Sequence, residues 1–243
     1  MDRLAPTRRP DARVVMYQRW RKLLFLHWEL PAEVLARALP PGLSLDTYEG
    51  RAFIGLVPFT MQGVRPALLP PFPPLSNFHE TNVRTYVHRE GKDPGVFFFS
   101  LDAANGIAVR LARAWYKLPY FYSRMTLADG TAGGWRTYRS ERHWPAPVPA
   151  TLSVRGLAEG PAAASTPGTL QHFLMERYFL YTAHGGALLR GQVHHTPYPV
   201  RGARVEGLEE SLLEAAGFHR PPAAPLVHAS DGVDVEVFAL QRV

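Results

Sequence analysis

In the segment "NFHETNVRTYV", residues 77–87, polar side chains alternate with small or β-branched ones from residue 80 onward, as expected for a β-strand. On a strand, Glu80, Asn82, Arg84 and Tyr86 share one face, while small or β-branched residues share the other. The aromatic run "GVFFFSLDA" follows at residues 95–103, after a glycine-marked turn. These two neighbouring strand patterns favour a protein that is mostly β.

Two interpretations fit the polar face of residues 80–86. On an open sheet, such a face is simply solvated. In a closed sheet, the same face would line a cavity, where Arg84 would bind a carboxylate through two parallel hydrogen bonds and Glu80 would balance its charge. The residues alone leave both interpretations open.

Similar strand patterns extend along most of the chain. They lie at residues 20–31, 44–64, 120–127, 134–142, 150–157, 187–206 and 225–240, separated by glycine and proline. Residues 44–64 predict a hairpin that turns at Glu49–Gly50, and the proline-rich residues 66–81 predict an irregular loop. Helices are predicted at residues 31–43, 105–119, 166–184 and 206–218. We therefore expect one α+β domain over residues 1–243, with β dominant and a loose N-terminal arm at residues 1–13.

The composition excludes several classes of protein. The chain has 243 residues, of which 46% are hydrophobic and 12% aromatic, as in an ordered globular protein. No apolar run is long enough to span a membrane, and no apolar segment follows the basic N-terminus as in a secretory signal. With no cysteine, disulfides and thiolate chemistry are excluded. A cytoplasmic location and no membrane partner are expected.

The net charge of +6 raises the question of nucleic acid. The 24 arginines and three lysines are spread along the chain, and no nucleic-acid-binding module is recognisable, so no nucleic-acid partner is predicted. No phosphate-binding glycine motif or zinc-ligand spacing occurs, and the adjacent His194 and His195 would point to opposite faces of a strand. We therefore predict no cofactor and no metal, and leave a homo-oligomer open.

Lys117 stands out in "WYKLPYFYSRM", residues 115–125. Its aromatic neighbours could desolvate the amine and lower its pKa, as a Schiff-base nucleophile requires. Alternatively, Lys117 is a cation that ends a helix just before Pro119, and the residues favour this second interpretation. In the same way, Glu176 and Arg177 in "MERYFLYT" form either an exposed stripe or a buried ion pair.

Six blocks together resemble a known family. They are "NFHETNVRTYV", "GVFFFSLDAAN", "ARAWYKLPYFYSRM", "MERYFLYT", "HHTPYPV" and "VHASDGVDVEVF", and they occur in the order of the YqjF-like family of uncharacterised proteins, across residues 17–240. That family is placed in the acetoacetate decarboxylase-like superfamily. The resemblance implies a curved, cone-like antiparallel β-barrel with a few flanking helices and a central cavity.

The resemblance does not carry over a catalytic lysine. Acetoacetate decarboxylases have a Gly-Tyr-Pro-Lys-Lys-like stretch, in which one lysine forms the Schiff base and the next lowers its pKa. When Pro119 is set on the proline of that motif, Tyr120 and Phe121 take the places of the two lysines. Lys117 lies two residues before the proline, without a lysine neighbour. The superfamily's imine mechanism is therefore not expected here.

Three hypotheses follow from these observations. The leading one is a cavity that binds a small anionic or carbonyl-containing molecule. Its candidate lining residues are Glu80, Asn82, Arg84, Tyr120, Arg124 and Glu176. The second is a lyase-type enzyme acting on a small keto acid through Lys117, or through Glu80 with Tyr120. The third is a structural or interaction module whose interior is filled by its own aromatic side chains, of which the chain has 28.

Overall fold

Thirteen strands of the described residues join in one mixed sheet. The computed structural model describes residues 1–115, 117–130, 134–145 and 149–243. The strands are β1 (Val14–Leu30), β2 (Ser44–Leu45), β3 (Ala52–Pro66), β4 (Phe78–Arg89), β5 (Lys92–Ala103), β6 (Tyr120–Asp129), β7 (Arg136–Trp144), β8 (Thr151–Ala163), β9 (Phe179–His184), β10 (Ala187–His194), β11 (Val200–Glu210), β12 (Leu226–Phe238) and β13 (Gln241–Arg242).

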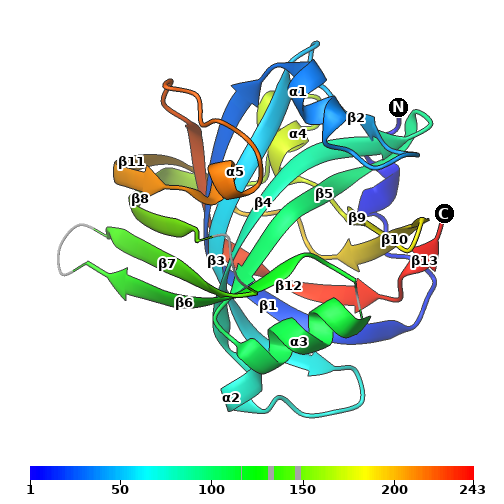
Figure 1. Ribbon diagram of the computed structural model, residues 1–243, viewed down its shortest axis with the longest axis horizontal. Coiled ribbons are helices and arrows are strands. Elements are labelled where there is room, and N and C mark those ends of the chain that lie inside the picture. Colours follow the sequence, from blue (N-terminus) through cyan, green and yellow to red (C-terminus); the bar gives the residue numbers. More distant parts are fainter. Residues whose placement is uncertain (116, 131–133, 146–148) are drawn as a thin grey trace.

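The helices are short and lie around the sheet (Figure 1). They are the 3-10 helix η1 (Ala5–Thr7) and the α-helices α1 (Ala32–Arg37), α2 (Pro73–Ser76), α3 (Gly106–Trp115), α4 (Leu170–Met175) and α5 (Leu212–Ala215). In the view of Figure 1, α2 and α3 lie at the lower end of the molecule and α1 and α4 in its upper part. None of the helices in the described ranges is long and apolar enough to cross a membrane.

The strand pairings close the sheet on itself twice. One closed path, here called the small ring, runs β10–β9–β5–β4–β3–β1–β12 and returns to β10. The other, the large ring, runs β5–β6–β7–β8–β11–β12–β1–β3–β4 and returns to β5. Strands β12, β1, β3, β4 and β5 therefore form a wall that both rings share.

The shared wall explains the long apolar runs of β1 and β3. Over residues 23–28 of β1 and 52–61 of β3 both faces of the strand are buried, so the sequence there is nearly all apolar instead of alternating. On β1, Leu24 and Leu26 pack in the core of the large ring with Leu152 and Val154, whereas Leu23 and Phe25 pack on the opposite side. The polar strand β4 belongs to the same wall.

The predicted strands are confirmed, but two predicted helices are wrong over most of their length. Of residues 166–184, only α4 is helical, beginning after Thr169, whose side chain accepts a hydrogen bond from the His172 amide. Of residues 206–218, only α5 is helical, because residues 206–210 pair with β8. The predicted turn at Glu49–Gly50 is present, but β2 pairs with β4 and not with β3.

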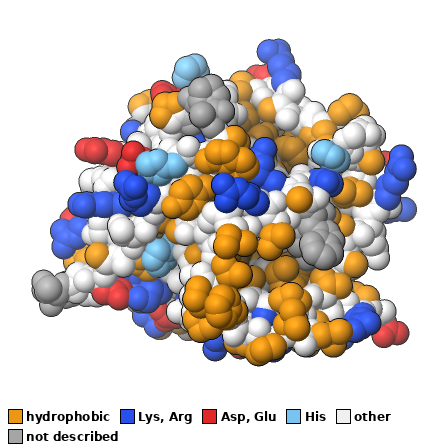
Figure 2. Space-filling model, turned by 60° about the horizontal axis from the view of Figure 1, so that its bottom comes forward, with side chains coloured by type: hydrophobic (Ala, Val, Ile, Leu, Met, Phe, Trp, Pro, Cys, Tyr) orange, Lys and Arg blue, Asp and Glu red, His pale blue; other side chains and the backbone are white. Residues whose placement is uncertain are grey.

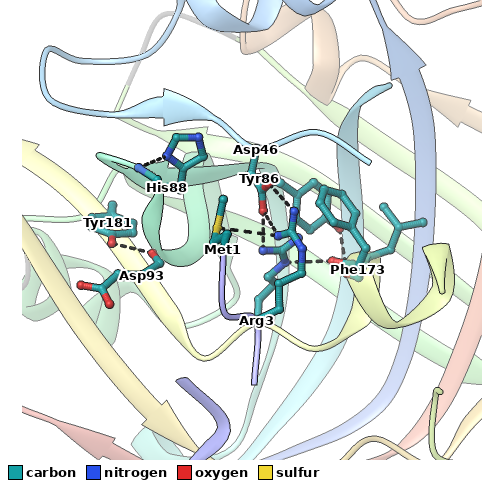
Figure 3. A network of polar contacts seen from close by, with 11 residues as sticks. Met1, Arg3, Asp46, Tyr86, His88, Asp93, Phe173 and Tyr181 are labelled. Carbon is teal, nitrogen blue, oxygen red and sulfur yellow. Dashed lines mark hydrogen bonds and ion pairs between the residues drawn. The ribbon is translucent and has the colours of Figure 1, made fainter. Parts of the chain in front are cut away.

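The sequence predicted a loose N-terminal arm, and this prediction is wrong. Arg3 binds the buried Asp46 with both terminal nitrogens, and Arg177 Nη1 donates to the same carboxylate at 2.8 Å. The Arg3 guanidinium also lies 4.9 Å from the ring centre of Phe173 in α4, and Figure 3 shows this network beside Tyr86. Gln192 donates to the carbonyl of Pro6, which is buried. The arm is thus anchored over the end of the small ring that carries α4.

Candidate functional site

The polar face of β4 is buried inside the small ring. Glu80, Asn82, Arg84 and Tyr86 are 2%, 5%, 8% and 0% exposed. Tyr86 packs with the aromatic cluster around Phe53 and Phe173, on the side of the wall opposite Val83. The predicted alternation is confirmed. The solvated open-sheet interpretation is wrong, because the polar face is buried, as is the opposite face, which packs inside the large ring.

Arg84 is a buried cation without a carboxylate partner. Its Nη2 donates to the carbonyl of Leu174 at 3.1 Å, and its Nε has no hydrogen-bond partner. The guanidinium lies 5.6 Å from the ring centre of Phe25 and 5.8 Å from that of Tyr86. Among the described residues, no carboxylate oxygen lies within 4.0 Å of the guanidinium. The prediction that Glu80 balances the charge of Arg84 is therefore wrong. Burying the Arg84 guanidinium therefore has a desolvation cost that no ion pair offsets.

Glu80 instead pairs with Tyr120, which stands at the start of β6. Tyr120 Oη donates to Glu80 Oε2 at 2.9 Å. Burial raises the pKa of Glu80 to about 8; the Tyr120 hydrogen bond opposes this shift and the nearby charge of Asp102 adds to it. Glu80 therefore holds a proton at neutral pH, and its carboxylic acid can donate that proton inside the ring.

His27 is a neutral histidine beside Arg84. Tyr86 Oη donates to the Leu174 carbonyl at 2.8 Å and lies 2.7 Å from His27 Nε2, so Nε2 carries the proton that Tyr86 accepts. This tautomer leaves His27 Nδ1 as an acceptor, and that atom has no partner. Burial, aided by the charge of Arg84, lowers the pKa of His27 well below 6.5.

Gly55 on β3 makes room for these two side chains. A Cβ atom at Gly55 would lie 3.0 Å from His27 Cδ2 and 3.4 Å from Arg84 Cγ. We expect Gly55→Ala to lower the free energy of unfolding by about 1–3 kcal/mol, because the side chains of His27 and Arg84 must shift within a packed interior. Urea unfolding checks this, with Gly202→Ala as the control, since a Cβ there meets only Glu159 O at 3.9 Å. Equal effects of the two substitutions would contradict the expected crowding.

Glu176 belongs to a second polar cluster in the same interior. It accepts hydrogen bonds from Tyr178 Oη at 2.7 Å and from the Tyr198 amide at 3.0 Å, and burial raises its pKa. Arg177 binds Asp46 instead, so the two residues are buried but do not pair with each other; the exposed-stripe and ion-pair interpretations are both wrong. Tyr198 packs edge-on against Phe25, at 5.7 Å between ring centres, which links this cluster to Arg84.

His195 completes this second cluster. Its ring stacks on Tyr178 at 4.5 Å between centres, and its Nδ1 lies 2.7 Å from the Thr196 carbonyl. Nδ1 therefore carries the proton, and Nε2 is a buried acceptor without a partner. Burial lowers the pKa of His195 to about 4, so the ring is neutral at pH 7.

Two candidate residues lie apart from these clusters. Lys117 is half-buried after the end of α3, with a left-handed φ of 55°, and its carbonyl accepts a hydrogen bond from Thr182 Oγ1. This position agrees with its interpretation as a helix-ending residue. Arg124 is exposed on β6, in register with Glu141 on β7, so it does not line the small ring.

Arg84 does not line either of the two best-formed pockets among the described residues. The best-formed pockets among the described residues have volumes of about 10 Å³, and one of them lies beside Glu80 and Pro58. Such a volume holds roughly one water molecule. No group of three or more His, Asp or Glu side chains in the described ranges is arranged to hold a metal ion.

Sequence reasoning missed His27, Gly55 and His195. A signal existed for His27, because it is the one polar residue in the buried run "LLFLHW", residues 23–28. Gly55 similarly interrupts the apolar run of β3. For His195 the sequence offered only its neighbour His194, and nothing in it indicates which of the two is buried.

Comparison with known proteins places this geometry in a family. Residues 17–234 match the model of the DUF2071 family, described as an uncharacterized conserved protein. The chain is 35% identical over 233 residues to an uncharacterized protein, YqjF, of Bacillus subtilis, which covers 96% of this chain and 94% of that protein. The resemblance inferred from the sequence blocks is thereby confirmed.

Solved structures with this fold are acetoacetate decarboxylase-like. The enduracididine biosynthesis enzyme MppR, complexed with pyruvate, has a TM-score of 0.65 at 11% identity, covering 96% of this chain and 91% of that one. An acetoacetate decarboxylase-like enzyme from Sphingomonas wittichii has a TM-score of 0.62 at 15% identity, covering 96% and 94%. At these identities the similarity establishes the fold alone.

Proposed function

The chain belongs to the DUF2071 family. From this premise we propose that its small ring is the cone-like barrel of the acetoacetate decarboxylase-like fold and that it binds a small carboxylate through Arg84. The observation that carries the proposal is the buried guanidinium without a carboxylate partner. Desolvating an ion costs several kcal/mol, and an anion held by two parallel hydrogen bonds would offset that cost. The unpaired Nε of Arg84 and its Nη2 provide the two donors.

Other polar atoms in the ring define the rest of the ligand. Glu80 holds a proton at neutral pH and can donate it to a carbonyl oxygen. Asn82 Oδ1 and His27 Nδ1 are buried acceptors without partners. A molecule with a carboxylate at one end and a carbonyl group beside it matches the two donors, Arg84 and Glu80. The two acceptors would bind a hydroxyl or amino group on the same molecule. The MppR structure complexed with pyruvate supports the same class of ligand.

Binding requires α4 to move. The position that a ligand carboxylate would take on Arg84 is occupied, because Arg84 and Tyr86 both donate to the Leu174 carbonyl in the last turn of α4. The ligand carboxylate would replace that carbonyl on Arg84 and displace the helix end. The arrangement with the Leu174 carbonyl on Arg84 is then the closed state of a binding site.

Thermal unfolding with and without pyruvate tests the proposal. A ligand that binds only the folded state stabilises it by about 2.7 kcal/mol at one hundred times its Kd. We expect pyruvate to raise the unfolding temperature, and pyruvamide, its uncharged amide, to have little effect. If neither pyruvate nor any other small carboxylate raises the temperature, the site binds no carboxylate and the third hypothesis, a filled structural module, is favoured.

A lyase activity on a small keto acid is the second candidate, and the protonated Glu80 favours it. When a β-keto acid loses its carboxylate as CO2, the electron pair of the broken Cα–carboxylate bond forms a double bond to the carbonyl carbon, and the carbonyl π electrons move to the oxygen. Glu80 could protonate that oxygen to give an enol, with Tyr120 as its hydrogen-bond partner. This step needs no lysine.

We therefore expect borohydride to trap no covalent adduct with pyruvate or acetoacetate. Mass spectrometry of the intact protein would show an unchanged mass, because no lysine is among the buried residues of the described ranges. The test includes Lys117→Ala as the control. An adduct on the wild-type protein that is absent from Lys117→Ala would contradict this mechanism and restore imine chemistry.

A further inference from the structure

Helix α3 turns an apolar stripe toward solvent. Ile107, Leu111 and Ala114 are exposed, with Arg110 between them, at the i, i+4 and i+7 spacing of one helical face. Surface helices usually bury such a stripe and expose the charged face. Among residues 106–114 of the helix, Val109 is the one buried side chain, so the exposed stripe has no covering element among the described residues.

The loop before α2 extends this apolar surface. Leu68, Leu69 and Phe72 are 79%, 57% and 62% exposed, on a proline-rich loop that projects below the sheet in Figure 1. Asn105, at the start of α3, donates to the Pro74 carbonyl at 3.2 Å and so ties the two segments together. The prolines stiffen the loop, so little conformational entropy is lost when it docks.

We call this surface the apolar underside. It consists of Leu68, Leu69, Phe72, Ile107, Leu111 and Trp144, which are six of the ten exposed large hydrophobic side chains of the described residues. Figure 2, in which the bottom of the molecule comes forward, shows hydrophobic side chains gathered there, with basic side chains among them. A concentration of this kind marks a contact surface.

Three arginines at the underside lack ion-pair partners among the described residues. Arg110 and Arg113 both lie 5.5 Å from the ring centre of Trp144, and Arg65 donates to the Leu69 carbonyl. Within the described part of the chain, none of these three arginines has a carboxylate within 4.0 Å. By contrast, Arg21, Arg136 and Arg201 elsewhere on the sheet are each ion-paired.

We propose that the apolar underside docks onto an anionic lipid surface. A projecting, stiff loop of leucine and phenylalanine is shaped to enter the interfacial region of a bilayer, and the arginines beside it would meet anionic headgroups. A second copy of the chain fits less well, since a two-fold contact would bring like-charged arginines together. The sequence predicted no membrane partner because no segment spans a bilayer; surface docking needs no such segment.

Vesicle flotation tests this proposal. The wild-type protein is mixed at low salt with vesicles of phosphatidylcholine, alone or with about one third phosphatidylglycerol. Two double variants, Leu69→Ser/Phe72→Ser and Ile107→Ser/Leu111→Ser, remove apolar side chains of the underside. The matched control is Val34→Ser/Leu226→Ser, which removes side chains of 41% and 43% exposure elsewhere.

We expect binding to the anionic vesicles only, weakened at about 1 M salt, where charges are screened beyond about 3 Å. Each underside variant should lower the partition coefficient at least about tenfold, as loss of two buried side chains predicts, and the control should bind like the wild type. Absence of binding, or equal binding of all variants, would overturn the proposal. So would a lipid-free dimer, seen by analytical ultracentrifugation, that the underside variants dissociate while no protein binds vesicles.

Discussion

Replacing Asp102 with asparagine should lower the free energy of unfolding by about 3–5 kcal/mol, because it leaves the buried Arg142 without a counter-ion. Asp102 on β5 accepts from Arg142 Nε and Nη2 on β7 at 2.8 and 2.7 Å, and from Ser123 Oγ on β6 at 2.7 Å. The side chains are 0% and 2% exposed. This pair spans β6, the strand that carries Tyr120 to Glu80. The midpoint of urea unfolding measures the effect.

Two comparisons separate this effect from a general loss of charge. Glu206→Gln removes one partner of the half-exposed Arg155–Glu206 pair and should cost no more than about 1 kcal/mol. The double variant Asp102→Leu/Arg142→Met, which removes both charges, should recover much of the stability that Asp102→Asn loses. A cost below about 1 kcal/mol for Asp102→Asn would mean that the pair does not stabilise the β5–β7 region.

The second large effect is on how stability depends on pH. The folded protein holds the Glu80 proton up to about pH 8, whereas the unfolded chain releases it near 4.5. Between these values the folded state binds more protons, so the contribution of Glu80 to stability falls as the pH rises. Glu80→Gln removes this contribution. Its stability relative to wild type should rise by roughly 1.4 kcal/mol per pH unit across the window, on the order of 5 kcal/mol in all.

Urea unfolding at pH 5, 7 and 9 checks this expectation. The difference between variant and wild type isolates Glu80, because buried histidines such as His27 and His195 titrate alike in both proteins. Glu206→Gln, at a half-exposed carboxylate, serves as the control and should show a nearly constant difference. Parallel curves for Glu80→Gln and wild type would show that Glu80 is ionised at neutral pH, which would remove the proton donor from the site.

The local parts of the fold were predictable from the sequence, and the helix lengths were not. The alternation at residues 80–87 predicted β4 correctly, because side-chain period is a local property of a strand. Residues 206–218 contain good helix formers, yet Glu206 pairs with Arg155 and Glu210 with Leu152 on β8. Pairing with a distant strand overrode the local helix propensity there.

The enclosure of the site depends on contacts that the sequence does not reveal. The strand pattern predicted that Arg84 and Glu80 share one face. It did not predict which strands would close around that face. Arg124 looked equivalent to Tyr120 in the same segment, yet the structure exposes one and turns the other toward Glu80. His27 reaches Tyr86 only because β1 and β4 both flank β3.

Calorimetric titration with pyruvate tests the central claim most directly, with the wild type, Arg84→Met and Arg124→Met. Arg84→Met should stay folded, since it removes an unpaired buried charge. Arg124→Met removes the same charge from an exposed site. We predict that pyruvate binds the wild type and Arg124→Met with similar affinity, and Arg84→Met about 100-fold more weakly, as loss of a buried charge pair implies. Equal binding to Arg84→Met, or no binding to the wild type, would contradict the proposed anion site.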